Sequence, residues 1–518
     1  MRKIHLLCNA HLDPCWLWEW EEGAAEALST FRTAADLCEE TNSLIFNHNE
    51  ATLYKWVEEF EPALFARIQN LVKAGRWHIM GGWYLQPDCN MPSGESFVRQ
   101  ILAGRLYFQE KFGVTPTTAM NFDPFGHTRG LVQILKKSGY DSYLFGRPHE
   151  EVCPLPPDGF IWVGYDGSEI AAHRFIGWYN APLGKAREKI ETWLKDNPER
   201  ELGLILWGVG NHGGGPSRKD VREIDAFIAQ CNDAEIIHST PEAYFAEMAA
   251  TNTKRPRREQ DLNSWAPGCY TSQIRLKQQH RLLENMLFMV EKMAAAATLQ
   301  GLMDYPKTAL HEALCDLLTA EFHDILPGSS VQPVEEAGLR IFHHGLEILS
   351  RLRAHAFFAL ASGQPRARDG EIPVFAYNPH PYPVEGVFEC EFNLPDFNFE
   401  DEFTVPTVRL NSEALPCQVE KELGNQAIDW RKRCVFHATL APSAMTRFDC
   451  TLETVLPGRP KSYWPVEHGC IKLKTDDIEV WINTATGLMD KFTVKDVDVL
   501  RKDAFLPLVM EDDADSWS

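Results

Sequence analysis

The stretch Asn121-Phe122-Asp123-Pro124-Phe125-Gly126-His127 decides how the fold of this chain is interpreted. It follows a short apolar run, Thr117 to Met120, that is typical of a β-strand, and it precedes Thr128-Arg129-Gly130 and a helix-like segment. A carboxylate at the carboxyl end of a strand, with a proline and a glycine turn behind it, lies where α/β enzymes place functional residues. We therefore expect Asp123 to belong to a functional site.

Two other stretches carry polar residues suited to the same site. His11-Leu12-Asp13-Pro14-Cys15-Trp16 follows the strand-like run Lys3 to Cys8, and Glu321-Phe322-His323-Asp324 lies near the end of a helical region. Side chains at i and i+2 of a strand share a face, so His11 and Asp13 can reach one ion. Each motif alone is more often structural, a solvated pair or a charge at a helix terminus. Their joint occurrence favours a site.

A shell of two imidazoles and two carboxylates indicates a borderline divalent cation. Imidazoles favour zinc over magnesium or calcium, and the absence of thiolates argues against a closed structural zinc site. Cobalt or nickel would also fit this shell.

Length and composition limit the class of protein. With 518 residues we expect roughly two to four domains. A formal net charge of -22 argues against a nucleic-acid partner. The N-terminus shows no signal region, and no stretch is apolar enough to cross a bilayer, so we expect no membrane partner. The 13 cysteines are scattered without a CxxC pair, which indicates reduced thiols in a cytoplasmic protein. The sequence does not decide whether the chain forms a homo-oligomer.

The pattern predicts a multidomain α/β, α and β chain. Residues 1–255 alternate strand-like and helix-like segments, which predicts a catalytic domain with a largely parallel sheet, open or closed into an irregular barrel. The expected strands are Lys3–Cys8, Ser43–Asn47, Trp77–Gly82, Thr117–Met120, Asp141–Phe145, Phe160–Tyr165, Glu169–Phe175, Leu202–Val209 and Ala234–His238. Phe160–Tyr165 and Glu169–Phe175 are expected to form a hairpin that turns at Asp166-Gly167. Ligands belong at the carboxyl ends of the parallel strands.

Residues 256–362 become helical after a polar segment, Thr251–Gln260, that resembles a linker. Apolar residues recur at helical spacing in Ser272–Leu299, Lys307–Glu321 and Val331–Leu360, which predicts a three-helix bundle. This bundle would deliver His323 to the edge of the first domain.

Residues 363–518 form the third predicted domain. Short strand-like runs between turns rich in Pro, Asn and Gly predict an antiparallel, sandwich-like β region. The chain stops at Asp515-Ser516-Trp517-Ser518 part way through this pattern, so we expect a truncated β domain from a longer protein.

Taken together, the motifs resemble those of the glycoside hydrolase family 38 α-mannosidases. The resemblance covers essentially the whole chain, and the set is highly specific because its members stand in the family's order: His11-x-Asp13-Pro14-x-Trp16, Asp123-Pro124-Phe125-Gly126-His127, Gly268-Cys269-Tyr270-Thr271-Ser272 and His323-Asp324. The implied activity is that of a retaining exo-α-mannosidase that hydrolyses terminal α-D-mannosyl residues of glycans or small mannosides.

The resemblance also implies residue roles. One zinc ion per chain would bind the mannose 2- and 3-hydroxyls, and Asp123 would attack the anomeric carbon to give a covalent mannosyl ester. The implied zinc ligands are His11, Asp13, Asp123 and His323. The implied substrate-binding residues are Trp16, Arg147, Asn211 and Asp324. Arg147 would contact Asp123, although a surface ion pair is an alternative for this arginine.

The general acid departs from the family's pattern. Family members carry an aspartate in the loop that here spans Gly208 to Pro216 and offers Asn211 and His212 instead. An asparagine is a poor proton donor, whereas a histidine exchanges protons near neutral pH. We hypothesise that His212 is the acid/base, with a nearby carboxylate such as Asp220 as the alternative.

Two other functions remain open. The chain could be a zinc-dependent amide or ester hydrolase resembling a deacetylase, in which Asp123 is a base or a ligand only. It could also be a mannose-binding protein whose catalysis is impaired by the loss of the acid. The motif set favours the mannosidase over both, with an α-mannoside as the partner.

Overall fold

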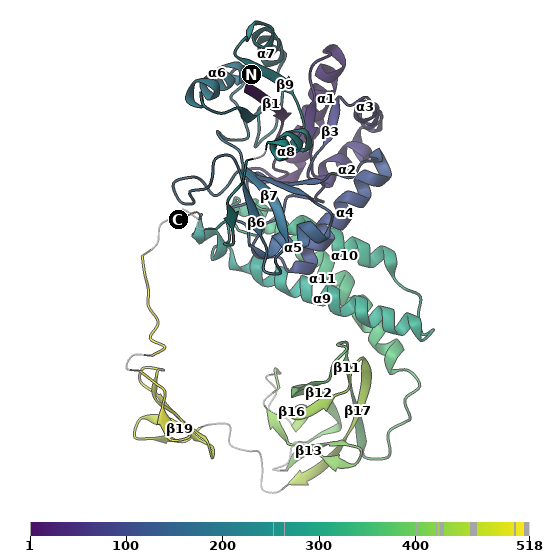
Figure 1. Ribbon diagram of the computed structural model, residues 1–518. Coiled ribbons are helices and arrows are strands. Elements are labelled where there is room, and N and C mark those ends of the chain that lie inside the picture. Colours follow the sequence, from purple (N-terminus) through teal and green to yellow (C-terminus); the bar gives the residue numbers. More distant parts are fainter. Residues whose placement is uncertain are drawn as a thin grey trace. The chain divides into compact units, whose positions relative to one another are not determined.

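The structure is a computed structural model that describes residues 2–251, 253–263, 265–398, 402–420, 422–424, 429–455, 464–501, 504–511 and 517. The chain divides into two compact units (Figure 1). The first comprises Met1–Ala356 with Asp515–Ser518, and the second comprises Phe357–Ala514. The three-domain boundaries drawn from the sequence stay a prediction.

The first sheet contains five strands and is parallel throughout. Its strands are β1 (Arg2–Asn9), β2 (Phe46–His48), β3 (Trp77–Ile79), β8 (Leu202–Trp207) and β9 (Ala234–His238). They follow the order β3-β2-β1-β8, and β9 also pairs with β1. β1 is fully buried from Ile4 to Asn9, as expected for a strand covered on both faces. Its carboxyl end therefore delivers the following residues to one edge of the sheet.

A second sheet of five strands carries the Asp123 stretch. Its strands are β4 (Thr118–Asn121), β5 (Ser142–Phe145), β6 (Phe160–Val163), β7 (Glu169–Arg174) and β10 (Arg257–Arg258). β4, β5 and β7 are parallel, whereas β6 and β7 form the antiparallel hairpin expected from the sequence. The predicted parallel sheet is confirmed, but the pairings divide its strands between two sheets.

Three expectations from the sequence need correction: the end of one strand, the nature of one linker and one helix that was missed. The strand expected over Trp77–Gly82 ends at Ile79, because Gly81 and Gly82 adopt positive φ angles of 68° and 86° that no regular strand allows. The segment Thr251–Gln260 contains β10, which pairs with β6 and is therefore more than a linker. Helix α8 was not foreseen, although Thr240 caps its first turn through the amide of Ala243.

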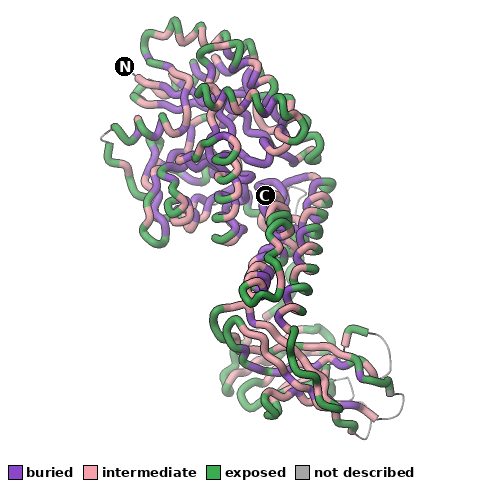
Figure 2. Tube along the Cα trace, turned by 90° about the vertical axis from the view of Figure 1, so that its right-hand side faces the viewer, coloured by how far each residue is buried: buried purple, intermediate pink, exposed green. Residues whose placement is uncertain are grey.

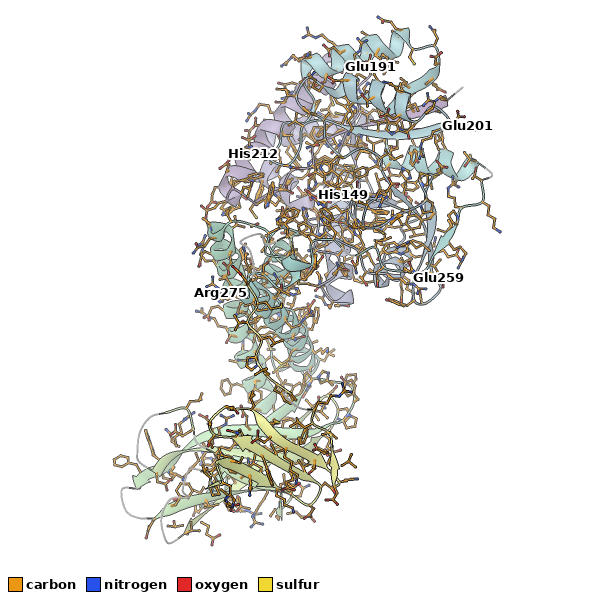
Figure 3. The ribbon with its side chains drawn as sticks, turned by 90° about the vertical axis from the view of Figure 1, so that its left-hand side faces the viewer. His149, Glu191, Glu201, His212, Glu259 and Arg275 are labelled. Atoms are coloured by element: carbon orange, nitrogen blue, oxygen red, sulfur yellow. The ribbon has the colours of Figure 1, made fainter. Side chains whose placement is uncertain are left out.

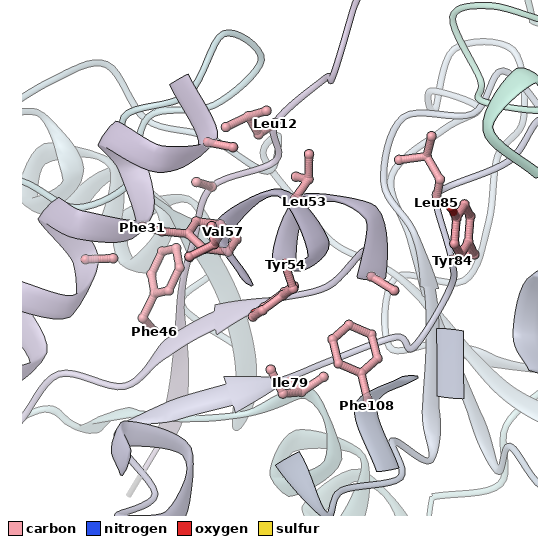
Figure 4. Close-up of a cluster of buried hydrophobic side chains, with 14 of the residues drawn as sticks. Leu12, Phe31, Phe46, Leu53, Tyr54, Val57, Ile79, Tyr84, Leu85 and Phe108 are labelled. Carbon is pink, nitrogen blue, oxygen red and sulfur yellow. The ribbon is translucent and has the colours of Figure 1, made fainter. Parts of the chain in front are cut away.

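Figure 2 shows that buried residues gather in the interior of the first unit, where the apolar ones form separate clusters against the two sheets. The helices between these strands are α1 (Trp20–Glu40), α2 (Ala51–Phe60), α3 (Pro62–Lys73), α4 (Gly94–Phe112), α5 (Gly130–Lys137), α6 (Ala186–Asp196), α7 (Arg218–Gln230) and α8 (Pro241–Ala250). Figure 4 shows Phe31 of α1 against Tyr54 of α2, with ring centroids 4.9 Å apart, and Tyr54 against Phe108 of α4 at 5.2 Å. Such edge contacts between buried rings hold three helices on one side of the first sheet.

Three long helices follow in the first unit, as the periodicity predicts. They are α9 (Ile274–Leu299), α10 (Lys307–Ala320) and α11 (Gln332–Ala361). Leu276, Leu317 and Phe342, one from each helix, are buried in the same apolar cluster as the strands β1 and β2. The segment between α10 and α11 therefore lies against the α/β part, and it carries His323.

The second unit is built from antiparallel sheets, which confirms the antiparallel β structure expected after residue 363. One sheet has the order β11-β17-β13-β14 and another β12-β16-β15. Their bounds are β11 (Glu371–Asn378), β12 (Val384–Asn398), β13 (Phe403–Leu410), β14 (Glu413–Ala414), β15 (Cys417–Glu420), β16 (Asp429–Leu440) and β17 (Ala444–Val455). Buried residues of both sheets share one apolar cluster.

A third antiparallel sheet of the second unit contains β18 (Val466–Glu467), β19 (Cys470–Lys474), β20 (Ile478–Asn483), β21 (Met489–Val494) and β22 (Val497–Asp498). All 13 cysteines of the chain are free thiols. Among the described residues, every helix is too short or too polar to span a bilayer.

A buried hydrogen-bond chain fixes the stretch Asn121 to His127. The Asn121 amide donates to the Tyr143 hydroxyl at 3.1 Å, and that hydroxyl lies 2.8 Å from His127 Nδ1. His127 Nε2 lies 2.9 Å from the carbonyl of Arg147. A neutral imidazole satisfies both partners, accepting at Nδ1 and donating at Nε2. Burial accordingly lowers the pKa of His127 from 6.5 to about 4.

This histidine should make stability depend on pH. Because its pKa is lower in the folded chain, its contribution is complete above pH 6.5 and is lost as the pH falls toward 4. At pH 5 the loss should be about 2 kcal/mol. We predict that His127→Gln lowers the free energy of unfolding at pH 7.5. The difference in this free energy between the variant and the wild type should be about 2 kcal/mol smaller at pH 5. Denaturant unfolding at both pH values measures it, and a constant difference would contradict the assignment.

Candidate metal centre and active site

Two loops at the carboxyl edge of the first sheet are joined by backbone hydrogen bonds. The amide of Asp13 donates to the carbonyl of Asn211 at 2.9 Å, and the amide of Asn211 donates to that of His11 at 2.7 Å. β1 and β8 are neighbouring parallel strands, so the segments that follow them leave the sheet together. At Gly208, with φ of 118°, a Cβ atom would lie 2.0 Å from the Asn9 carbonyl oxygen. Only glycine permits this close approach.

His323 reaches this edge through a backbone anchor. Its amide donates to the carbonyl of Gln86 at 3.2 Å, and its Nδ1 lies 3.0 Å from the same oxygen. Nδ1 therefore carries the proton that donates to Gln86, so Nε2 is the nitrogen that faces Asp13 and that a cation would bind in place of a proton. This is the tautomer that a metal ligand requires.

Three buried atoms converge on one point. Nε2 of His11, Oδ1 of Asp13 and Nε2 of His323 all lie within 4.8 Å of one another. Asp13 Oδ1 lies 3.0 Å from the first nitrogen and 3.3 Å from the second. None of the three atoms has a hydrogen bond of acceptable geometry to another described residue. Unpaired buried polar atoms are costly, so these residues fit a divalent cation. Asp123 lies at the edge of this cluster, with Oδ2 3.8 Å from His11 Nε2.

The electrostatics of the cluster favour positive charge. Burial opposes protonation of His323, but the close contact with the Asp13 carboxylate and the negative charges of Asp324 and Asp123 outweigh it and raise its pKa to about 10. Burial raises the pKa of Asp324 to about 7, against the opposing charge of His323. The carboxylates therefore create a strongly negative potential at a buried point, which is what attracts a cation.

Asp123 is held by two donors. Nε of Arg147 donates to Oδ1, and the hydroxyl of Tyr179 donates to Oδ2 at 2.8 Å. The predicted contact between Arg147 and Asp123 is thus present, and it is largely buried. Four aromatic rings surround the guanidinium within 5.5 Å of their centroids: Phe125, Trp178, Trp265 and Trp517. Such cation–π contacts restrict the arginine to one orientation.

The expected substrate-binding residues Trp16 and Asp324 lie beside the cluster. The Trp16 indole donates to the carbonyl of Ser329 at 3.2 Å, and the Ser329 hydroxyl donates to Asp324 at 2.6 Å. Trp18, whose indole donates to the Asp13 carbonyl at 3.1 Å, makes an edge contact with Trp16. Aromatic faces next to hydrogen-bonding carboxylates suit a pyranose ring.

A cavity of about 280 Å³ adjoins the aromatic rings around Arg147. It is lined by Asn90, Phe125, Asn263, Trp265, Pro267 and Tyr270. Phe125 and Trp265 contact both this cavity and Arg147, the partner of Asp123. The Gly268–Ser272 motif therefore contributes Tyr270 to a wall of the site, with its hydroxyl accepting from Asn90 at 2.8 Å.

The two candidates for the acid occupy different positions. His212 lies exposed at the margin of the α/β part (Figure 3), with Nε2 2.6 Å from Glu22 and its ring edge-on to Trp18 at 4.4 Å. Asp220 is buried, and its carboxylate accepts from the amides of Gly184 and Ala186 at 3.0 Å each. Asp220 therefore joins helices α6 and α7, and the structure gives it no place beside the cluster.

Asn211 faces the interior of the site. Its backbone adopts a positive φ of 68°, and its side-chain amide lies within hydrogen-bond distance of the Tyr179 hydroxyl, whose one proton goes to Asp123. Tyr179 and Gln86 contact the candidate site, and sequence reasoning missed both. Neither belongs to a recognisable motif: each lies in an irregular loop after a strand, β7 and β3 respectively, and its importance depends on contacts between distant segments.

A second group of potential ligands differs from the first. His280, Glu284 and Glu321 are buried and close together. Their carboxylates are already hydrogen-bonded, however, because Gln100 donates to Glu321 at 3.1 Å and Ser96 donates to Glu284 at 2.6 Å. This group connects α4, α9 and the end of α10, and it anchors the segment that carries His323.

Family models match most of the first unit. Residues 1–267 match the model described as glycosyl hydrolases family 38 N-terminal domain, and residues 265–360 match the alpha mannosidase middle domain. Alpha-mannosidase G of Dictyostelium discoideum is 29% identical over 65% of this chain and 32% of its own length. Human Alpha-mannosidase 2C1 is 28% identical over 70% of this chain and 35% of its own. The chain thus spans about a third of these relatives.

A solved structure shares the fold. The crystal structure of an alpha-mannosidase from Enterococcus faecalis V583 superposes with a TM-score of 0.75 at 19% identity, covering 95% of this chain and 62% of that one. At this identity the likeness concerns the fold alone.

The difference between the two clusters is testable. We predict that His323→Ala weakens the binding of a divalent cation at least ~100-fold, because it removes a ligand from the group with unpaired atoms. His280→Gln in the satisfied group should leave the affinity unchanged. Calorimetric titration of dialysed protein with Zn²⁺ measures the affinity of both variants. Equal losses of affinity in the two variants would show that the group of His11, Asp13 and His323 is not the preferred cation site.

Proposed function

Because the chain belongs to glycoside hydrolase family 38, we propose that it is a retaining exo-α-mannosidase that acts on terminal α-D-mannosyl residues with one zinc ion per chain. The observation that carries the proposal is the convergence of His11, Asp13 and His323 with the carboxylate of Asp123 beside them. Cobalt or nickel could take the same ligands. The 13 free thiols support a cytoplasmic location.

In this proposal His11, Asp13, His323 and Asp123 hold the zinc ion. When bound, the zinc ion would supply Lewis-acid chemistry toward the hydroxyls of the mannosyl residue. The chain's own residues bind the rest of the sugar: Trp16 offers a stacking face, and Asp324 and Asn211 offer hydrogen-bond acceptors.

Asp123 is the proposed nucleophile. Its oxygen forms a bond to the anomeric carbon while the glycosidic C–O bond breaks, and water later cleaves the resulting mannosyl ester with net retention. Arg147 and Tyr179 support this role because each donates to one carboxylate oxygen and so fixes the direction of attack.

His212 is the proposed acid/base. It would give a proton to the departing oxygen and take one from the attacking water. Two contacts support it: the carboxylate of Glu22 orients the imidazole at 2.6 Å, and Trp18 connects it to the Asp13 loop. Asp220 is a weaker candidate because its oxygens bind helix amides.

The proposed function predicts both the substrate and the dependence on a metal. The protein should hydrolyse an aryl α-D-mannoside, lose at least ~90% of this activity on exhaustive chelation, and regain it with zinc. The equivalent β-mannoside and α-glucoside are matched controls that should not react.

A metal-saturated protein that is inactive on α-mannosides would overturn the proposal. Binding of mannosides without turnover would instead indicate a lectin-like protein, and cleavage of acetylated sugars would indicate a deacetylase-like hydrolase. Trapping of a 2-fluoromannosyl ester on Asp123, seen by mass spectrometry, distinguishes the nucleophile from a mere ligand.

The proposed role of His212 predicts a loss of activity that depends on the leaving group. His212→Gln should lower kcat/KM by roughly 10²- to 10³-fold on a mannobiose, whose leaving group needs a proton. The same variant should lose much less on 2,4-dinitrophenyl α-mannoside, whose leaving group departs without one. Glu22→Gln should give a smaller loss of the same kind. Equal losses on both substrates would show that His212 is not the acid.

A further inference from the structure

Lys189 of α6 is a partly buried lysine whose amine, among the described residues, hydrogen-bonds to peptide carbonyls alone. Its Nζ donates to the carbonyls of Trp178, Asn180 and Leu206 at 2.5, 2.8 and 2.7 Å. An ammonium group has three N–H donors, so these three acceptors satisfy it fully. Burial lowers the pKa of Lys189 to about 7, so keeping a cation here has a cost that an ordinary surface lysine does not bear.

Two of the three carbonyls that Lys189 binds, those of Trp178 and Asn180, flank Tyr179. Asn9 donates to the carbonyl of Tyr179 itself at 3.0 Å, and the amide of Ala181 donates to Gly208 at 2.8 Å. Three successive carbonyls, at residues 178, 179 and 180, are therefore all taken by side chains from elsewhere. An irregular loop that binds its partners in this way is fixed in one conformation.

Tyr179 connects this loop to the reacting groups. Its hydroxyl lies between Asp123 and Asn211, and its ring packs on the imidazole of His11 with centroids 4.6 Å apart. The Tyr179 side chain thus touches the proposed nucleophile, a proposed metal ligand and Asn211, a proposed substrate-binding residue. A small shift of the loop would move all three contacts at once.

We propose that Lys189 is a positioning residue of the active site, which fixes the loop of Tyr179 so that the phenol donates to Asp123 in the orientation needed for attack. Lys189 touches neither substrate nor metal ligand and acts only through this loop. The inference rests on the proposed function for its catalytic consequence, but its structural part stands independently.

The contacts of Lys189 favour a positioning role over simple packing. A residue that served only the core would be replaced without loss by an apolar chain, because burying a charge is unfavourable. Here the charge bridges the loop at residues 177–182 and the end of β8 at Leu206, two segments that meet at the catalytic edge. Lys185, at the start of the same helix, is exposed and pairs only with Glu188.

The test uses Lys189→Met, which keeps the aliphatic stem and removes the three donors, with Lys185→Met as the matched control. Hydrogen exchange should become faster at residues 177–182 in the first variant and stay unchanged in the second. With an aryl α-mannoside and saturating zinc, kcat should fall roughly tenfold while KM stays within about twofold. A purely structural role would lower the melting temperature without this division between kcat and KM.

A double-mutant cycle with Tyr179→Phe shows whether the effect passes through the phenol. Lys189→Met should have little further effect on kcat once the hydroxyl is absent. The proposal would be overturned if the losses in kcat of the two single variants multiplied in the double variant. It would also be overturned if folded Lys189→Met kept the wild-type kcat, or if its hydrogen exchange at residues 177–182 were unchanged. Lys189→Gln, which keeps two donors, replaces the methionine variant if that protein does not fold. If the wild type hydrolyses no α-mannoside, the proposed function fails, and the exchange measurement alone decides whether Lys189 holds the loop.

Discussion

The carboxylate of Asp13 between two buried imidazoles is the interaction on which the site depends. Its Oδ1 lies within 3.3 Å of both His11 and His323, where water does not reach it. Such an arrangement is unstable for isolated polar groups, because desolvation of a carboxylate is expensive without full pairing. The surrounding structure must therefore hold the three groups in place, and Gln86, Trp18 and the Asn211 backbone do so from three directions.

Support for the site comes largely from backbone groups and not from charge pairs. His323 is oriented by a carbonyl, the 11–13 segment by the backbone of Asn211, and Tyr179 by carbonyls bound to Lys189 and Asn9. Arg147 and Asp123 form the main exception, and there four aromatic rings enclose the cation. Peptide groups have fixed geometry, so they position neighbours more rigidly than long charged side chains, which lose rotamer freedom on pairing.

Much of the fold could be predicted because its strands and helices have clear periodicity. The strand before Asp123, the hairpin of β6 and β7 and the three long helices were all expected from alternation or helical spacing. The division into two sheets was not, since it arises from pairing between distant strands. In the same way motifs identified His11, Asp13, Asp123 and His323, whereas Tyr179 and Gln86 have no local pattern and are recognised only by the contacts they make.

The position of His323 after α10 has a consequence for biosynthesis. The N-terminal strands that carry His11 and Asp13 leave the ribosome long before the segment between α10 and α11 is made. The nascent α/β part therefore holds an incomplete ligand set, and a cation bound there would lack an imidazole until the helices dock. Anchoring of that segment by Glu321 and His280 makes the last ligand arrive with a folded helical scaffold. Tight metal capture would then report that synthesis has passed this point and that the helices have packed correctly.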